Sequence, residues 1–285
     1  MHTSAFEILG PIMVGPSSSH TAGALRIALV ARSLGPKPFA QVNFSLYNSF
    51  ARTYKGHGTD RALVAGILGL APDDERVRDS FALAEQAGLA FSFSPAPTEA
   101  GVGRHPNTVT VNMLGRDGRR MSVTGESLGG GRIRISAVNG VGLELTGDYP
   151  TIFIVQRDRP GALASITGTL SATNTNIAAI NTFRKERGGA AYTIIEVDEA
   201  ISGSVLNMLR LLPQVIMASR VEIPGSAQVS PDAALGIDFN TGSELLEACK
   251  GSRSPIGARM RHREREPPGG DQRAEQPAAL SPLHI

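Results

Sequence analysis

Residues 151–174 read TIFIVQRDRPGALASITGTLSATN, and this stretch decides the fold of the second half of the chain. TIFIVQ is a short apolar run typical of a buried strand, and DRPG is a turn that leads into a helical pattern. The segments that follow predict two strands, a helix and a last strand, at residues 176–184, 190–198, 202–212 and 214–223. The order βαββαβ in about 75 residues is the ferredoxin-like arrangement.

The first half of the chain alternates between helical and strand patterns. Its apolar spacing predicts an amphipathic helix that ends at Gly35-Pro36, a strand, and two further helices, at residues 21–34, 41–47, 61–70 and 74–88. From residue 89 the period changes, and four short alternating strands separated by glycines follow, at 89–94, 107–114, 119–125 and 131–140. This unit therefore contains a mixed or antiparallel sheet and ends near Gly147. The fold class predicted for the whole chain is α+β.

A polar run, VGPSSSHT at residues 14–21, stands at the start of the first predicted helix. A helix start offers free backbone N–H groups and a partial positive charge, and the serine and threonine hydroxyls add donors for an anion. His20 adds a group that titrates near neutral pH. Capping a helix needs only one such residue, so the run fits an over-polar cap or an anion site equally well.

A second polar cluster, KGHGTD at residues 55–60, has the same design. His57 lies between two glycines, and Thr59 and Asp60 follow as residues of a helix start. A lone histidine in a loop is usually only solvated, but two histidines beside helix starts in one unit favour a site. His105 in RHPNT is interpreted as structural or exposed, and the three glycines of ESLGGGRI (126–133) as a bulged entry into a strand.

Composition excludes several classes of function. The 285 residues carry a formal net charge of +2 and no long basic block, which predicts neither a nucleic-acid partner nor a membrane surface. The single cysteine, Cys249, excludes a disulfide framework and any metal site made of this chain's thiolates alone. No secretion signal or spanning segment is recognisable, so a soluble cytoplasmic protein is predicted. Neither a G-x-S-x-G elbow, a P-loop nor an H-E-x-x-H motif is present, which argues against hydrolase chemistry.

Several motifs together resemble a known family. GPIMVGPSSSHTAGALRIALVARSLG, FSLYNSFARTYKGHGTDRALVAGILG, HPNT and ESLGGGRI occur in this order, and the chain resembles the beta subunits of bacterial iron–sulfur-dependent L-serine dehydratases from about residue 4 to 222. The first unit also resembles the allosteric substrate-binding domain of some phosphoglycerate dehydrogenases. DRPGALASITGTL followed by NTNIAAI resembles an ACT domain. The domains expected are 1–147, 148–224 and a remainder, 225–285.

The resemblance implies deamination of L-serine to pyruvate and ammonia without pyridoxal phosphate (PLP). In this family an iron of a [4Fe-4S] cluster acts as a Lewis acid on the substrate hydroxyl. The cysteines that hold the cluster belong to an alpha subunit or domain, and the single cysteine of this chain agrees with its being the beta part. The expected partners are therefore an alpha subunit and L-serine, with no metal ligand in this chain.

The resemblance also implies roles for the polar residues. The residues expected to bind the substrate, most of them at its carboxylate, are Ser17, Ser18, Ser19, Thr21 and Thr59. His20 and His57 are the candidates for the general base or for steering the leaving hydroxide. The sequence does not rank the two, and we favour His20 because a group beside the carboxylate site lies near Cα.

The ACT-like half has two interpretations, a regulatory amino-acid site at a homodimer interface or dimerisation alone. The residues where such domains often bind an effector are Asp158, Pro160, Gly161, Ala162, Asn176 and Ile177.

Beyond about residue 225, a linker is followed by GSELLEACKGSRSPIGARM, which resembles the opening of the alpha part, and by a tail of disordered composition. The chain is interpreted as the front of a truncated beta–alpha fusion or as a beta subunit with a tail of its own. Two functions besides a dehydratase subunit stay open, a stand-alone L-serine sensor and an inactive truncation product.

Overall fold

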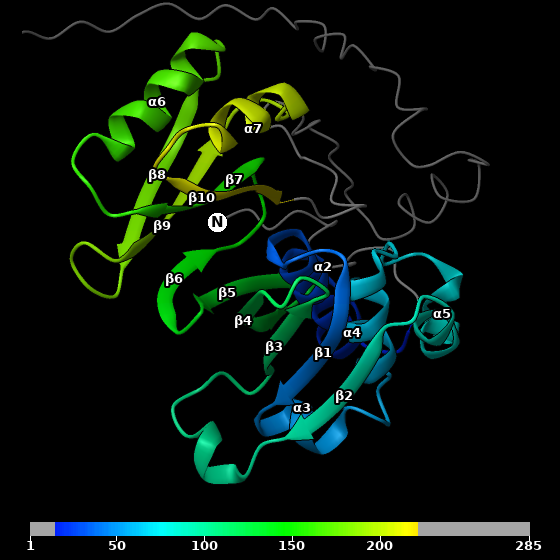
Figure 1. The fold of residues 1–285 in the computed structure, drawn as a ribbon. Coiled ribbons are helices and arrows are strands. Elements are labelled where there is room, and N and C mark those ends of the chain that lie inside the picture. The colour runs from blue at the N-terminus through cyan, green and yellow to red at the C-terminus, as the bar shows by residue number, and fades with distance from the viewer. Residues whose placement is uncertain (1–14, 222–285) are drawn as a thin grey trace, which may run out of the picture. The chain divides into compact units, whose positions relative to one another are not determined.

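The computed structural model describes residues 15–221. The predictions for the linker, the alpha-like remnant with Cys249 and the tail lie outside the described residues. Two sheets form within the described range, one of six strands and one of four (Figure 1). The mixed α+β content confirms the predicted fold class. The sheets lie within the first two predicted domains, whose exact boundaries stay a prediction.

The six-stranded sheet has the order β2-β1-β3-β4-β5-β6. Only β1 and β2 run parallel, and each of the other neighbouring pairs is antiparallel, so of the two predicted alternatives, a mixed or an antiparallel sheet, the sheet is mixed. The strands are β1 (Phe39–Leu46), β2 (Ala90–Pro95), β3 (Thr108–Gly115), β4 (Arg120–Gly129), β5 (Arg132–Val138) and β6 (Val141–Leu145). The sequence predicted the first five, and the short β6 was missed.

Helices α2 (Ala24–Leu34) and α4 (Thr59–Leu68) pack against each other and cover one face of this sheet (Figure 1). They approach closely at Gly66, where an added Cβ would lie 2.5 Å from the carbonyl oxygen of Leu25 and 2.6 Å from the Cβ of Ala28. The core between helices and sheet is apolar because β1, β3 and β4 alternate buried and more exposed side chains. The other face of the sheet is polar.

Three segments differ from the sequence prediction. The helix expected over residues 21–34 begins earlier, as a π-helical turn, η1 (Ser18–Gly23), that continues into α2. The short helix α3 (Asn48–Thr53) was not predicted. The helix expected over 74–88 is a 3₁₀ turn, η2 (Glu75–Asp79), followed by α5 (Ser80–Gln86). The carboxylate of Asp74 accepts the N–H of Arg76 and caps that tight first turn. A second 3₁₀ turn, η3 (Thr98–Gly101), precedes β3.

The second sheet confirms the predicted order βαββαβ. Its elements are β7 (Thr151–Arg157), α6 (Ala162–Ala172), β8 (Ile177–Arg184), β9 (Ala190–Val197), α7 (Gly203–Arg210) and β10 (Val215–Val221). The strands lie in the order β10-β7-β9-β8, and all neighbours are antiparallel. Ile152 and Ile154 of β7 pack with Ile166 and Leu170 of α6 in an apolar cluster. In the strand order given above, β8 is one of the two edge strands of the sheet.

None of the helices among residues 15–221 has the length and apolar character needed to cross a membrane.

Candidate active site

The serine run begins a helix, and its first turn is π-helical. Ser17 is extended (φ −143°, ψ 123°), and its carbonyl oxygen accepts from the N–H groups of Thr21 at 2.9 Å and Ala22 at 3.4 Å. The Ser17 Oγ accepts the backbone N–H of His20 at 3.1 Å, so Ser17 is the residue of the run that caps the helix. Single π-helical turns occur frequently at functional sites.

The imidazole of His20 lies between two rings and two hydroxyls. Its ring centroid is 5.4 Å from that of the buried Phe50 and 4.8 Å from that of His57, both in edge-to-face geometry. Its Nε2 lies 3.1 Å from the Oγ of Ser49, and its Nδ1 lies 3.4 Å from the Oγ of Ser17. The structure thus brings together the two histidines that the sequence singled out, although 37 positions separate them.

His57 is attached to the serine run through its backbone. The Oγ1 of Thr21 donates to the carbonyl oxygen of His57 at 3.0 Å, and the N–H of His57 donates to the carbonyl oxygen of Thr53. The His57 side chain is exposed. Thr21 is itself buried, so its hydroxyl fixes the KGHG turn against η1 and leaves the His57 ring at the surface.

The predicted substrate-binding hydroxyls fall into three groups. Those of Ser17 and Thr21 are engaged with the two histidines, as described above. No hydrogen bond to the hydroxyl of Ser18 or Ser19 is found among residues 15–221, and both side chains are partly exposed. Thr59 is fully buried, and its Oγ1 has no hydrogen-bond partner in the same range. Ser18 and Ser19 are therefore the hydroxyls most available to a ligand.

The carbonyl side of the serine run is held by β4. The Oγ of the buried Ser127 donates to the carbonyl oxygen of Ser19 at 2.8 Å. Gly23 packs against the same serine, and a Cβ added there would overlap its Oγ. Asn107 holds Ser127 in turn, because its carbonyl oxygen accepts the Ser127 N–H at 3.0 Å.

Two further motifs of the sequence have structural roles. The Nδ1 of His105 accepts the N–H of Asn107 at 3.2 Å, so the structural interpretation of His105 is confirmed. The backbone of Gly129, Gly130 and Gly131 has positive φ throughout, and the register of β4 and β5 shifts between Ser127 and Gly129. The three glycines therefore form the bulged turn that the sequence predicted.

Burial lowers the pKa of His20 below its ordinary value, and the positive charge of a protonated His57 would lower it further. His20 is therefore mostly neutral at pH 7, and a neutral imidazole is the form that can accept a proton. The histidine cluster therefore has the components of a proton-transfer site.

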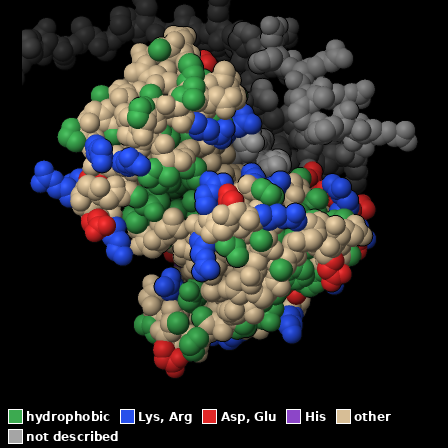
Figure 2. Space-filling model, in the orientation of Figure 1, with side chains coloured by type: hydrophobic (Ala, Val, Ile, Leu, Met, Phe, Trp, Pro, Cys, Tyr) green, Lys and Arg blue, Asp and Glu red, His purple; other side chains and the backbone are tan. Residues whose placement is uncertain are grey.

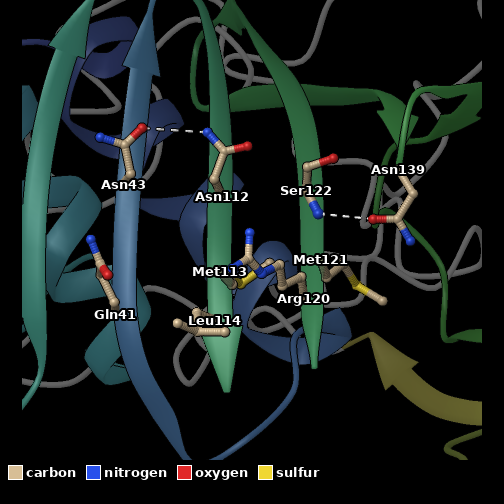
Figure 3. Close-up of a pocket in the computed structure, with 9 residues that line it drawn as sticks. All are labelled: Gln41, Asn43, Asn112, Met113, Leu114, Arg120, Met121, Ser122 and Asn139. Carbon is tan, nitrogen blue, oxygen red and sulfur yellow. Dashed lines mark hydrogen bonds between the residues drawn. The ribbon is translucent and has the colours of Figure 1, made fainter. Parts of the chain in front are cut away.

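A groove of about 360 Å³ lies on the polar face of the six-stranded sheet (Figure 3). It is lined by other residues than those of the histidine cluster. Its amides bond to one another: the Nδ2 of Asn112 donates to the Oδ1 of Asn43, and the Oδ1 of Asn139 accepts the N–H of Ser122. Arg120 is its one charged lining residue. No residue of the histidine cluster lines this groove, so it is not part of the candidate active site.

The residues predicted to bind an effector in the second sheet lie in two places, four of them at the start of α6 and two, Asn176 and Ile177, after its end at the opposite end of the sheet. The carboxylate of Asp158 pairs with Arg184 at 2.6 Å and accepts the N–H of Gly188, and these contacts lower its pKa. Gly161 is the N-cap of α6, and Pro160 is exposed while Ala162 is buried. Asn176 donates to Asp198 at 2.5 Å, and Ile177 begins β8. The Asp158 carboxylate thus ties this loop to the β8–β9 turn.

Comparison with known proteins identifies the family. Residues 4–137 match the model of the serine dehydratase beta chain, and residues 151–210 match that of the ACT domain. "L-serine dehydratase, beta chain" of Peptoniphilus asaccharolyticus is 42% identical over 220 residues, which cover 77% of this chain and 98% of the relative. The chain belongs to the serine dehydratase beta chain family.

A second relative agrees with membership in the serine dehydratase beta chain family, and a third belongs to another family. "Probable L-serine dehydratase, beta chain" of Bacillus subtilis is 40% identical over 220 residues, with the same coverage of both chains. The D-3-phosphoglycerate dehydrogenase of the same organism is 24% identical over 168 residues, 58% of this chain and 31% of that one. The predicted likeness of the first unit to the allosteric domain of such dehydrogenases stays a prediction, whereas the predicted ACT domain is confirmed.

Proposed function

We propose that this chain is the beta component of an L-serine dehydratase, which converts L-serine to pyruvate and ammonia together with an alpha subunit. The observation that carries the proposal is the contact between the rings of His20 and His57, in a run whose Ser18 and Ser19 hydroxyls have no hydrogen-bond partner among residues 15–221. The names of the relatives, which are beta chains, support an alpha partner.

The proposed iron–sulfur cluster is assigned to that partner. Among residues 15–221 no group of three or more His, Cys, Asp or Glu side chains could hold a metal ion. Iron–sulfur clusters are held mainly by cysteine thiolates, and the one cysteine of the chain, Cys249, lies outside the described residues. The described residues do not fit a [4Fe-4S] cluster, so the proposal derives no step of this chain from it. It involves no PLP.

The role proposed for this chain is to bind serine and move its Cα proton. The N–H groups at the start of η1 and the hydroxyls of Ser18 and Ser19 donate hydrogen bonds to the carboxylate. A neutral His20 takes the proton from Cα, and the β-hydroxyl departs, so that one water is lost overall. The aminoacrylate released becomes an imine, and its hydrolysis gives pyruvate and ammonia. His57, whose ring centroid lies 4.8 Å from that of His20, is proposed to steer the leaving hydroxide.

The positioning hydroxyls are proposed to act through the histidines. Ser17 holds the backbone and ring of His20, and Thr21 holds the carbonyl group of His57. Thr59 is buried, and its proposed contribution is to the start of α4 next to the KGHG turn rather than to a direct substrate contact.

The histidine variants His20→Asn and His57→Asn test the proposal in an enzyme reconstituted from this chain and an alpha subunit. Loss of a general base lowers kcat by about 10²–10⁴-fold, so His20→Asn is expected to fall in this range. The replacement of Ser165, a residue in the first turn of α6, by Ala serves as a control that keeps turnover within a few-fold. Near-normal turnover of a chain that lacks both His20 and His57 would refute the proposal.

The ACT domain is proposed to pair with a second copy. Within the described residues β8 bonds only to β9 and leaves one edge open. Hydrophobic side chains gather over the four-stranded sheet (Figure 2), and its exposed large ones include Ile180 at 40% and Ile216 at 59%. We also propose an effector site for L-serine in this domain. Its residues are those predicted from the sequence, Asp158, Pro160, Gly161, Ala162, Asn176 and Ile177.

A further inference from the structure

Ser49 was not singled out by the sequence, yet its hydroxyl is the nearest polar group to a ring nitrogen of His20. The Oγ of Ser49 lies 3.1 Å from Nε2, whereas the Oγ of Ser17 lies 3.4 Å from Nδ1 on the other side of the ring. Each ring nitrogen therefore faces one serine hydroxyl, and the two serines belong to segments 32 positions apart.

The position of Ser49 is fixed by the loop that carries the HPNT motif. Its N–H donates to the carbonyl oxygen of Pro106 at 2.9 Å, and its own carbonyl oxygen accepts from the Oγ1 of Thr53 at 2.8 Å. The neighbouring Asn48 donates through Nδ2 to the carbonyl oxygen of Gly101 at 2.9 Å. The start of α3 is thus held from outside the helix, and the Ser49 hydroxyl is presented to His20 by a rigid segment.

The hydrogen bonds of Ser17 indicate which nitrogen of His20 carries the proton. The Oγ of Ser17 already accepts the backbone N–H of His20, and its own proton is free to be donated to the facing ring nitrogen, which is the arrangement inferred here. The ring nitrogen that faces this proton is Nδ1, and Nδ1 can accept it only when it is unprotonated. In the neutral ring the proton then lies on Nε2, and Nε2–H donates to Ser49.

We propose that Ser49 is a positioning residue that holds the neutral His20 ring with its proton on Nε2. Nδ1, on the side of the serine run, is then the nitrogen that accepts the substrate proton when the Ser17 hydroxyl gives up its hydrogen bond to it, a consequence that rests on the proposed function. Phe50 packs against the same ring, and His57 is the titratable group whose charge acts on it. Ser49 does not contact the substrate, and it acts through the tautomer and orientation of the imidazole.

The tautomer is measured directly by ¹H–¹⁵N NMR of the histidine rings in the full chain at pH 8, with His20→Asn for assignment. We expect an unprotonated Nδ1 and a protonated Nε2 for His20. Ser49→Ala is expected to mix the tautomers and to lower the pKa of His20, since the imidazolium loses an acceptor. Ser49→Thr keeps the hydroxyl and is expected to restore both. Ser165→Ala, which removes a hydroxyl from the first turn of α6, is the matched control.

Three NMR outcomes overturn the proposal: a protonated Nδ1 in the wild-type chain, an unchanged His20 spectrum in Ser49→Ala, or a pKa raised by that substitution. The last result would mean that Ser49 donates to Nε2 instead of accepting from it.

The catalytic consequence has its own measurement. In the reconstituted enzyme Ser49→Ala is expected to lower kcat at least about tenfold with little change in KM, and Ser49→Thr to recover it. An unchanged kcat would overturn the role of Ser49. If the wild-type reconstituted enzyme does not deaminate L-serine, the proposed function fails, while the NMR result still decides the tautomer.

Discussion

His20 is surrounded by groups that favour its uncharged form. Phe50 and the bulk of η1 bury part of the ring, and His57 adds a like charge when it is protonated. A base must be free of its proton before it can act, and burial favours that unprotonated form of His20. The same burial has a consequence for stability that is separate from catalysis.

The folded chain is expected to lose stability as the pH falls through 6.5. The pKa of His20 is lowered from its ordinary 6.5 in the folded state, so the unfolded state binds more protons between the two pKa values. The free energy of unfolding therefore rises with pH across that window, and the contribution is fully present above pH 6.5. Urea titrations from pH 5 to 8 measure it.

The variant His20→Asn removes this titration, and the expected result is a flatter dependence of the free energy of unfolding on pH between 5 and 7. An identical pH dependence in wild type and variant would show that His20 has the same pKa in the folded and unfolded chain.

At the scale of elements, the site depends on the contact between η1 and β4. Ser127 donates to the carbonyl oxygen of Ser19 and occupies the space beside Gly23. The variant Gly23→Ala is expected to destabilise the fold by about 1–3 kcal/mol, because the new methyl group overlaps Ser127. In a Ser127→Gly background the same substitution is expected to cost less, since the obstructing side chain is gone.

Gly168→Ala in α6 is the matched control for this cycle, because nothing lies within 4 Å of a Cβ added there. It is expected to stabilise the chain by about 0.5–1 kcal/mol, since alanine is the better helix former. Thermal unfolding measures the change in stability of each variant relative to its parent chain. Equal costs of Gly23→Ala with and without Ser127 would contradict the packing of η1 against β4.

The sequence was sufficient for elements with a clear period or turn chemistry. The alternation in NTVTVNML and the Gly35-Pro36 stop predicted β3 and the end of α2 to within a residue or two. It was not sufficient for α3, whose six residues are too few to show a helical period, nor for η1, because the π-turn depends on contacts with β4. The 3.1 Å contact between Ser49 and His20 is likewise tertiary, and local pattern carries no signal for it.

At the scale of the whole molecule, the described residues supply half of a proposed active site. They bring together two histidines and free hydroxyls, and the residues from 15 to 221 include no cluster of metal-ligating side chains. The ACT domain adds an open sheet edge suited to a second copy. Under the proposed function, the chemistry that needs both halves depends on assembly with an alpha subunit.

The most direct test of this account is pyruvate formation from L-serine under anaerobic conditions by this chain alone, by an alpha subunit alone, and by the two mixed. The account predicts turnover only in the mixture, and its loss when His20 and His57 of this chain are replaced. Turnover by this chain alone, or undiminished turnover by the mixture without the two histidines, would contradict it.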